Sequence, residues 1–539
     1  MRTPSAFVTV ALVATALAGP AFPQQSCEKL KSLQLPGIEI VSATLVPEGP
    51  LDLTTAANPN ARPAVVPARC DVKAVARPTS DSEIGFEVWL PPSGWNGKYM
   101  QLGNGGWAGS IPLPSMIAPL RRGYAAAGTD DGHKGNDASW AIGHPEKLID
   151  FGYRAPHRTR AAAEAIVKAF YGRAPERNYF VGCSDGGREA LMEAQRYPED
   201  FNGIVAGAPA NAWSRLFAGF VWNEQALLAD PASAIPPAKL AAIQKAVLAA
   251  CDALDGVKDS LIEDPRACRF DPAVLACKGT ETADCLTAPQ VKALARIYAG
   301  PKDPRTGEQI FPGYPPGTEN APAGWNPWIT ALAPPNAIQF FFGNSYYGQA
   351  VFERRDWDFR TMDFTNDVAF ALRKAGAVID STNPDLRSFR AHGGKLIQYH
   401  GWGDAAISPL SSIAYYESVR SFLTRFPDPR SEGRKQVEDF YRLFLVPGMG
   451  HCGGGLGPNS FGNTGAWPAG DASHDILTAI ETWVEQGTAP EELIGSGKVP
   501  EDAARTLTRP LCVYPQVARY KGSGDPYDAA NFECAAERR

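Results

Sequence analysis

Between residues 99 and 208 the sequence alternates between short strand-like runs and helical segments, and this rhythm limits the possible folds more than any other feature. Residues 178–181 and 203–206 are short apolar runs, and residues 187–197 between them have the pattern of a helix. Residues 159–171, which precede these runs, have the pattern of an alanine-rich amphipathic helix. A strand, a helix and a further strand in this order indicate a right-handed crossover onto a parallel sheet. We therefore predict an α/β fold with a mostly parallel sheet.

Strand-like segments also occur on either side of this region. Residues 84–90 have the short alternating pattern of antiparallel strands that open a sheet. From about residue 213 to residue 382 the chain is rich in proline, aromatic residues and cysteine and shows no buried parallel strand. The strand pattern returns at residues 395–400 and 441–446. We therefore predict a single α/β domain interrupted by an inserted lid. The α/β domain would comprise residues 25–212 and 383–539, and the lid residues 213–382.

The N-terminus has the three parts of an export signal, which we place at residues 1–24. Arg2 supplies a positive charge, residues 7–18 an apolar run, and Ala16 and Ala18 a small-residue cleavage pattern. The run is too short to span a bilayer, so retention as a membrane anchor is the weaker alternative. The ten cysteines, which lack C-x-x-C or zinc-finger spacing, agree with export and indicate five disulfides. We expect a secreted or periplasmic protein.

The charge and hydropathy patterns argue against two classes of partner. The net charge is −6, and lysine and arginine are scattered, so the chain lacks the basic patch that a nucleic-acid-binding protein needs. No other segment approaches the ~18 consecutive apolar residues of a membrane-spanning helix. We therefore expect neither nucleic-acid binding nor a membrane span.

Residues 182–186 read Gly-Cys-Ser-Asp-Gly, a G-x-S-x-G sequence that follows a predicted strand and opens a predicted helix. A nucleophile elbow needs this arrangement, because a sharp turn with little room for side chains lifts the serine oxygen clear of the sheet. The bare pattern often arises by chance, and its position between a strand and a helix gives it weight. We predict Ser184 as the nucleophile of an α/β-hydrolase.

A serine nucleophile of this type needs an acid and then a histidine later in the chain. Among seven histidines, His451 lies in a glycine-rich loop directly after a strand pattern, at the sheet edge where open α/β folds bind ligands. Asp404 follows the preceding strand by a short loop and would hold the imidazole tautomer. A turn-forming aspartate is the alternative for Asp404, and we expect only a core or supporting role for His400.

Cysteines adjoin both of these predicted catalytic residues, since Cys183 precedes Ser184 and Cys452 follows His451. A disulfide between them would hold their Cα atoms ~4.4 to 6.8 Å apart. The alternative is a pair of unrelated structural cysteines, but a cysteine beside both the nucleophile and the base favours the bond. We predict that it holds nucleophile and base together.

This Cys-Ser, Asp and His-Cys arrangement resembles that of the tannase and feruloyl esterase family, over essentially the whole mature chain and including the closing residues 509–525. Within that family the chain also resembles the bacterial terephthalate half-ester hydrolases. The resemblance implies an α/β-hydrolase core, a lid inserted after the nucleophile unit, and esters of aromatic acids as substrates. It also implies the disulfide pairs Cys183–Cys452, Cys27–Cys70, Cys251–Cys268, Cys277–Cys285 and Cys512–Cys534.

An acyl-transfer site needs backbone N–H donors that stabilise the developing oxyanion. One donor should be the residue after the nucleophile, Asp185. The other should come from the glycine-rich residues 103–107, where the resemblance points to Gly106 and an ordinary turn is the alternative. Residues 130–133, which include two aspartates and a histidine, are interpreted as a structural loop and not as a second site.

Residues 252–261 concentrate carboxylates around a glycine, and oxygen ligands of this kind suit Ca²⁺. The spacing is not that of an EF-hand, so a solvated acidic turn is an equal alternative on the sequence alone. The family resemblance implies a structural calcium ion in the lid. Its ligands would be the side chains of Asp252, Asp255 and Asp259 and the backbone carbonyls of Val257 and Leu261.

Together these features predict a secreted serine esterase acting on hydroxycinnamoyl or galloyl esters, free or attached to plant polysaccharide or polyphenol. An aromatic-rich stretch of the lid, residues 325–357, would select the substrate, and Ile407 would offer an apolar wall to the acyl group. One alternative is terephthalate half-ester hydrolysis, for which no arginine can be placed against the second carboxylate. Another is a non-catalytic secreted module that binds aromatic or carbohydrate ligands on the same scaffold.

Overall fold

The computed structural model describes residues 25–53, 62–331, 337–426, 436–463 and 470–536. The predicted export signal at residues 1–24 lies outside these ranges. Within them, no helix combines the length and the apolar character that crossing a membrane requires.

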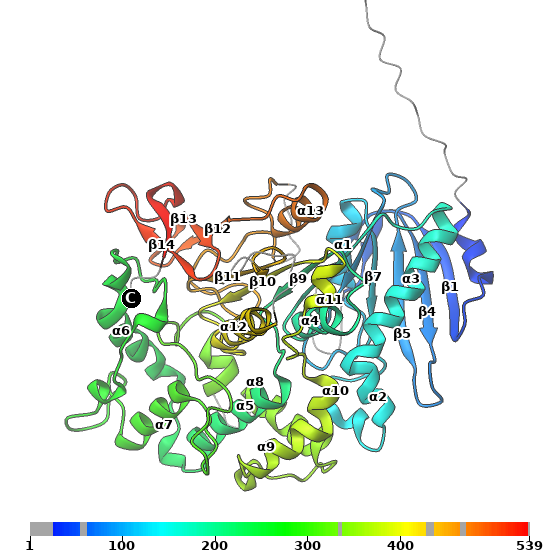
Figure 1. The fold of residues 1–539 in the computed structure, drawn as a ribbon. Helices are drawn as coiled ribbons and strands as arrows, with labels where there is room; N and C mark the ends of the chain where they lie inside the picture. The colour runs from blue at the N-terminus through cyan, green and yellow to red at the C-terminus, as the bar shows by residue number, and fades with distance from the viewer. Residues whose placement is uncertain (1–24, 54–61, 332–336, 427–435, 464–469, 537–539) are drawn as a thin grey trace, which may run out of the picture.

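A nine-stranded sheet forms the centre of the fold (Figure 1). Its first three strands pair antiparallel, and a further antiparallel pair, β5 with β7, joins them to six strands that run parallel. The predicted α/β fold with a mostly parallel sheet is therefore confirmed. In the order in which they pair, the strands are β1 (Ile38–Val46), β4 (Arg69–Ala76), β5 (Ile84–Leu90), β7 (Ala125–Thr129), β6 (Lys98–Leu102), β8 (Arg177–Cys183), β9 (Gly203–Gly207), β10 (Lys395–Gly401) and β11 (Tyr441–Val446).

Alternate side chains of the parallel strands enter two separate cores, one on each face of the sheet. In β8, Phe180 packs into one core and Tyr179 into the other, and Ala125 and Ala126 of β7 divide in the same way. Helices from both sides supply the remaining apolar side chains. The first core contains α3 (Ala155–Tyr171), α4 (Asp185–Arg196) and α12 (Leu410–Arg425), and the second α1 (Leu113–Arg121) and α13 (Ile476–Gln486).

The chain between β9 and β10 adds no strand to this sheet in its described residues, and most of its helices lie at the bottom of Figure 1, with α6 at the left. This region corresponds to the predicted lid, whose boundaries at residues 213 and 382 remain a prediction. Its helices are α5 (Trp213–Leu228), α6 (Leu240–Cys251), α7 (Ala288–Ala299), α8 (Ile338–Asn344), α9 (Asn366–Ala371) and α10 (Ala377–Ile379).

The remaining elements are short and lie around the sheet. Arg509, on the penultimate hairpin, forms a buried ion pair with Asp259 and so ties the C-terminal part of the chain to the inserted region. These elements are α2 (Pro145–Ile149), α11 (Arg387–Ala391), β2 (Gly49–Leu51), β3 (Ala64–Val66), β12 (Glu492–Val499), β13 (Asp502–Cys512), β14 (Gln516–Tyr520) and β15 (Phe532–Ala536).

Two helices begin earlier than the sequence pattern predicted. Helix α4 begins at Asp185 and not at residue 187, because the turn at Ser184 leads directly into it. Helix α3 begins at Ala155 and not at residue 159, with Pro156 in its first turn. Proline is tolerated there because the first N–H groups of a helix have no intrahelical partner. Both differences lie at helix ends, where apolar periodicity carries little information.

All ten cysteines are paired in five disulfides. The pairing that the family resemblance implied is therefore confirmed in full. The pairs are Cys27–Cys70, Cys183–Cys452, Cys251–Cys268, Cys277–Cys285 and Cys512–Cys534.

Candidate active site

Ser184 lies on the sharp turn between β8 and α4, with φ 65° and ψ −119°. This conformation is costly for a residue with a side chain and marks a site that the surrounding fold holds in place. A Cβ on Gly182 would lie 2.4 Å from the Gly186 carbonyl oxygen, and a Cβ on Gly186 would lie 2.8 Å from that of Asn104. The two glycines of the G-x-S-x-G sequence are therefore required by close backbone approach, as a nucleophile elbow demands.

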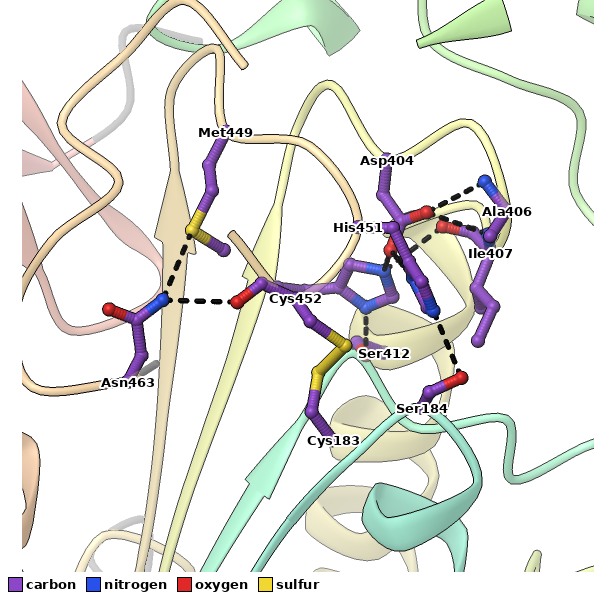
Figure 2. Close-up of a disulfide and its surroundings, with 11 residues drawn as sticks. Cys183, Ser184, Asp404, Ala406, Ile407, Ser412, Met449, His451, Cys452 and Asn463 are labelled. Atoms are coloured by element: carbon purple, nitrogen blue, oxygen red, sulfur yellow. Dashed lines mark hydrogen bonds and ion pairs between the residues drawn. A yellow bond between two sulfur atoms is a disulfide. The ribbon is translucent and has the colours of Figure 1, made fainter. Parts of the chain in front are cut away.

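Three side chains from the ends of different strands form a continuous hydrogen-bonded chain (Figure 2). His451 Nε2 lies 2.9 Å from Ser184 Oγ, and His451 Nδ1 lies 2.8 Å from Asp404 Oδ2. Because the carboxylate accepts from Nδ1–H, Nε2 is left as the acceptor for the serine hydroxyl. The structure thus brings together the three residues that the sequence selected, in an arrangement that can activate a serine.

The Asp404 carboxylate is buried and is surrounded by donors. Its Oδ1 accepts hydrogen bonds from the backbone N–H groups of Ala406 and Ile407, both at 2.8 Å. Burial by itself would raise the pKa of this carboxyl, but His451 and His400 hold it well below the ordinary value. Asp404 is therefore an anion at neutral pH, as the acid of a catalytic triad must be.

His400 is the second imidazole on this carboxylate. Its Nε2 lies 3.1 Å from Asp404 Oδ2 and 3.0 Å from the Ile407 carbonyl oxygen, while its Nδ1 lies 2.7 Å from Ser412 Oγ. Since both partners of Nε2 are acceptors, Nε2 carries the proton and Nδ1 accepts from the serine. The supporting role expected for His400 is thus a direct contact with Asp404.

The disulfide between Cys183 and Cys452 lies beside the serine and the histidine (Figure 2). Its Cα atoms are 5.9 Å apart although the residues are separated by 269 positions in the sequence. Asn463 supports the histidine side of this link by donating to the Cys452 carbonyl oxygen at 3.1 Å. The bond therefore joins the loop that carries Ser184 to the loop that carries His451.

The two expected oxyanion donors lie near the nucleophile, one next to it in the sequence and one in the wall of the same cavity. Asp185 is the first residue of α4, so its backbone N–H has no acceptor within the helix. Gly106, at φ +59°, lines the same cavity as Ser184. Asn104, two residues earlier, accepts a hydrogen bond from the Gly186 N–H at 2.8 Å and so attaches the loop to the start of α4.

A buried acidic cluster, which sequence reasoning missed, includes the side chain of Asp185 and so adjoins these donors. It consists of the side chains of Asp131, Asp185 and Glu189, which offer ligand atoms within 4.8 Å of one another. Arg188 supplies a positive charge by donating to Asp185, and its other nitrogens bind backbone carbonyls. Burial raises the pKa values of Asp131 and Asp185, and the neighbouring carboxyl of Glu189 raises them further. Asp131 was interpreted from sequence as part of a structural loop, and no periodic pattern links it to Glu189.

A cavity of about 330 Å³ opens over Ser184, and it is walled by apolar side chains. Of the nine aromatic residues that the sequence highlighted in residues 325–357, only Trp328 and Phe342 line it, whereas Trp325, Tyr346 and Tyr347 are buried in the core of the inserted region. Ile407 lines the cavity as expected. Sequence reasoning missed the wall formed by α5, whose cavity-lining residues recur at helical spacing: Trp213, Leu216, Phe217 and Phe220.

Residues 252–261, which contain the three aspartates of the predicted calcium site, form a tight loop closed by the Cys251–Cys268 disulfide. Asp252, Asp255 and Asp259 each accept hydrogen bonds from backbone N–H groups of the same segment. Asp259 also pairs with Arg509. The three carboxylates are not among the described clusters whose ligand atoms all lie within 4.8 Å of one another.

Comparison with known proteins agrees with this geometry. The family model described as "Tannase and feruloyl esterase" matches residues 70–535. An uncharacterized esterase of Xanthomonas campestris pv. campestris is 46% identical, over 98% of this chain and 93% of its own. The mono(2-hydroxyethyl) terephthalate hydrolase of Piscinibacter sakaiensis is 34% identical, over 89% of this chain and 87% of its own. The crystal structure of feruloyl esterase B from Aspergillus oryzae superposes with a TM-score of 0.84 at 30% identity, covering 94% of this chain and 99% of that one.

Proposed function

Because the chain belongs to the tannase and feruloyl esterase family, we propose that it hydrolyses esters of aromatic acids with Ser184 as nucleophile, His451 as general base and Asp404 as the orienting acid. That it is a carboxylic ester hydrolase follows from the family and from its esterase relatives. The observation that carries the proposed mechanism is the hydrogen-bonded chain from Ser184 through His451 to Asp404.

The reaction would proceed by two acyl transfers. As Ser184 Oγ attacks the ester carbonyl carbon, His451 Nε2 takes the hydroxyl proton, and the oxyanion is held by the N–H groups of Gly106 and Asp185. The bond to the alcohol oxygen then breaks, and the imidazolium returns its proton to the departing alcohol. A water molecule, deprotonated by the same imidazole, attacks the acyl-enzyme and releases the acid and the free serine.

The apolar cavity supports an aromatic acyl group. The rings of Trp213, Phe217, Trp328 and Phe342 surround it, and stacked or edge-on contacts with a substrate ring suit such side chains. Apart from His451, the described residues that line it carry no ionisable side chain. A free carboxylate on the acyl ring would therefore lose its hydration without gaining a cation, which argues against the terephthalate half-ester alternative.

A panel of esters with matched alcohols tests the substrate class. We expect hydrolysis of methyl ferulate, methyl gallate or both, and at least about tenfold lower kcat/KM for the terephthalate half-ester than for its uncharged methyl diester. Equal rates on these two terephthalates would contradict the proposed cavity. The panel also asks whether hydroxycinnamoyl or galloyl esters are preferred.

Substitution of the serine tests the mechanism. Ser184→Ala should lose hydrolysis by about four orders of magnitude or more and should also lose labelling by a fluorophosphonate probe. Wild-type protein that is folded yet neither labelled nor active would instead favour the non-catalytic binding module. Retained hydrolysis in Ser184→Ala would overturn the mechanism.

We also propose that residues 252–261 bind a structural calcium ion through the side chains of Asp252, Asp255 and Asp259 and the carbonyls of Val257 and Leu261. The donors are of the kind that calcium prefers, and Asp252 Oδ1 is buried without a hydrogen-bond partner among the described residues. When bound, the ion would supply charge neutralisation within this loop and no step of ester cleavage. Binding would have to draw the three carboxylates closer around a common point.

Thermal unfolding tests the calcium proposal. The protein purified with a chelator should gain several degrees in unfolding midpoint when calcium is added, and Asp252→Asn should gain much less. An unchanged midpoint together with no heat of calcium binding in calorimetry would contradict the proposal.

Export of the mature chain is the last part of the proposed function. It is supported by the five disulfides, which persist in oxidising compartments. Expression of the full chain in a bacterial host, followed by N-terminal sequencing of the protein outside the cytoplasm, should reveal cleavage close to residue 24. Plant polysaccharide or polyphenol esters, as natural substrates, belong to the same proposal and can be added to the ester panel.

A further inference from the structure

Asn104 connects the loop that carries Gly106 to the acidic cluster. Its backbone N–H donates to Glu189 Oε2 at 3.2 Å, and its side-chain Nδ2 donates to Asp131 Oδ2 at 3.1 Å. The same side chain donates to the Thr129 carbonyl oxygen at 2.7 Å. Since the Asn104 carbonyl also accepts from the Gly186 N–H, this buried residue fixes the loop and the start of α4 relative to each other.

The acidic cluster holds more carboxyl groups than its arginine can neutralise. Asp131, Asp185 and Glu189 are each at most 2% exposed, and Arg188 Nε is directed at Asp185. Glu193, one turn further along α4, adds another buried carboxyl near Glu189. Several buried anions around one guanidinium would be very costly, and uptake of protons relieves this cost.

The hydrogen bonds of Asn104 identify which oxygens can share such a proton. Asn104 occupies Asp131 Oδ2 and Glu189 Oε2, so Oδ1 and Oε1 remain. These two oxygens are buried, and like Asp185 Oδ2 neither has a hydrogen-bond partner among the described residues. Ligand atoms of the two side chains lie within 4.8 Å of each other. One proton between them would satisfy both atoms.

We propose that Asp131 and Glu189 share one proton, and that this neutral-plus-anion pair holds Asn104 and thereby positions the oxyanion donors of Gly106 and Asp185. Asn104, Asp131 and Glu189 are then positioning residues for the esterase reaction. The inference rests on the proposed function, because it assigns a role to the surroundings of the proposed oxyanion hole.

Amide substitutions test the shared proton sharply. Glu189→Gln can keep an oxygen toward Asn104 while its N–H₂ donates to Asp131, and Asp131→Asn can do the reverse. Each single variant therefore imitates the protonated partner. In the double variant Asp131→Asn with Glu189→Gln, both amide oxygens are needed by Asn104, so two N–H₂ groups face each other. Asp185 Oδ2 is the one acceptor of the cluster left for them, and it lies beside residue 189, so the N–H₂ of residue 131 stays unpaired.

Steady-state kinetics on an ester that the wild type hydrolyses should show this pattern. We expect each single amide variant to retain kcat within about threefold, as a conservative rescue. The double amide variant, Glu189→Leu and Asn104→Ala should each lower kcat by about 30-fold or more, with KM changed less than about threefold, because loss of a single oxyanion donor can cost 10² to 10³ in kcat.

Two results would overturn the proposal: a Glu189→Gln variant as impaired as Glu189→Leu, or a double amide variant no worse than the product of the two singles. A metal ion held by the three carboxylates would give the first result, because every amide would weaken it. A double variant that fails to fold while both singles fold supports the same pairing.

Thermal midpoints of these variants, measured in a Ser184→Ala background, separate this inference from the proposed function. If Ser184→Ala keeps hydrolysing esters, the proposed function fails. The non-additive loss of midpoint in the double amide variant still tests the shared proton, since it does not depend on catalysis. Additive midpoints together with a serine-dependent reaction would overturn only the inference.

Discussion

Buried carboxyls lie at two places near the nucleophile, and their pKa values are shifted in opposite directions. Asp404 is 2% exposed, and its pKa is held below the ordinary value. Asp131 and Asp185 are fully buried, and their pKa values are raised. Both groups lie at the carboxyl edge of the parallel strands, so burial and position in the fold are alike.

The difference comes from the partners of each carboxyl. Asp404 faces two imidazoles and two backbone N–H groups, which stabilise its anion. Asp131 faces Glu189 and Asp185, which repel a further negative charge. Burial raises the cost of any charge, and the neighbouring groups then decide whether the carboxyl ionises or keeps its proton. Asp404 therefore suits the orientation of a base, whereas Asp131, with a proton shared with Glu189, suits a structural role.

The largest expected effect is a contrast between matched amides. Asp404→Asn should lower kcat by about 10³- to 10⁴-fold, because a neutral amide neither stabilises the imidazolium nor enforces the tautomer of His451. Asp131→Asn should lower kcat by no more than about threefold. Steady-state kinetics on one ester checks both predictions. Similar losses of kcat in the two variants would contradict the proposed difference in protonation between Asp404 and Asp131.

The Cys183–Cys452 disulfide, which links the Ser184 turn to the His451 loop, should have the next largest effect. The double variant Cys183→Ala with Cys452→Ala should lower kcat by about 10- to 100-fold, because it frees the His451 loop from the Ser184 turn. Stability should also fall by about 2 to 5 kcal/mol. As a control, Cys512→Ala with Cys534→Ala should lose stability but keep kcat. Equal kcat losses in the two double variants would show that the active-site bond has only a general stabilising role.

Removal of one donor from Asp404 should have a smaller effect. His400→Phe should lower kcat by about tenfold, since a hydrogen bond to a charged group contributes about 1.5 to 3 kcal/mol. His400→Gln, which can still donate to the carboxylate, should recover much of that loss. If the phenylalanine variant matches the wild type, the two backbone N–H groups and His451 alone maintain the Asp404 anion.

The smallest expected effect is on the pH dependence of folding stability, to which Asp404 and Asp131 should contribute with opposite signs. The lowered pKa of Asp404 contributes stability that is present above about pH 4 and is lost as the pH falls further. The raised pKa of Asp131 means that the folded state retains a proton, so stability decreases as the pH rises above about 4. Each group contributes about 1.4 kcal/mol per pH unit within its window.

Denaturant unfolding between pH 3 and 8 measures these contributions. The stability of the wild type relative to Asp131→Asn should decrease with rising pH, whereas its stability relative to Asp404→Asn should increase with rising pH and then level off. Parallel difference curves would show that the two regions do not differ in protonation.

Local sequence determined the nucleophile turn and the positions of several strands along the chain. The requirement for glycine at position 182 is local, because a Cβ there would lie 2.4 Å from the Gly186 carbonyl oxygen, whereas glycine at position 186 makes room for the backbone of the distant Asn104. Apolar runs located the strands around β8, β9, β10 and β11, and the carboxyl ends of parallel strands meet at one edge, so Asp404 and His451 could be selected before their contacts were known. The family resemblance supplied the disulfide pairing.

Only the tertiary structure decided the wall of the cavity and the protonation of the buried acids. Helix α5 lines the cavity with Trp213, Leu216, Phe217 and Phe220, which in sequence look like any apolar helix face. Asp131 and Glu189 lie 58 positions apart and meet only because the ends of β7 and the first turns of α4 converge. The charge of a carboxyl depends on the groups that surround it in space, and no pattern along the chain records them.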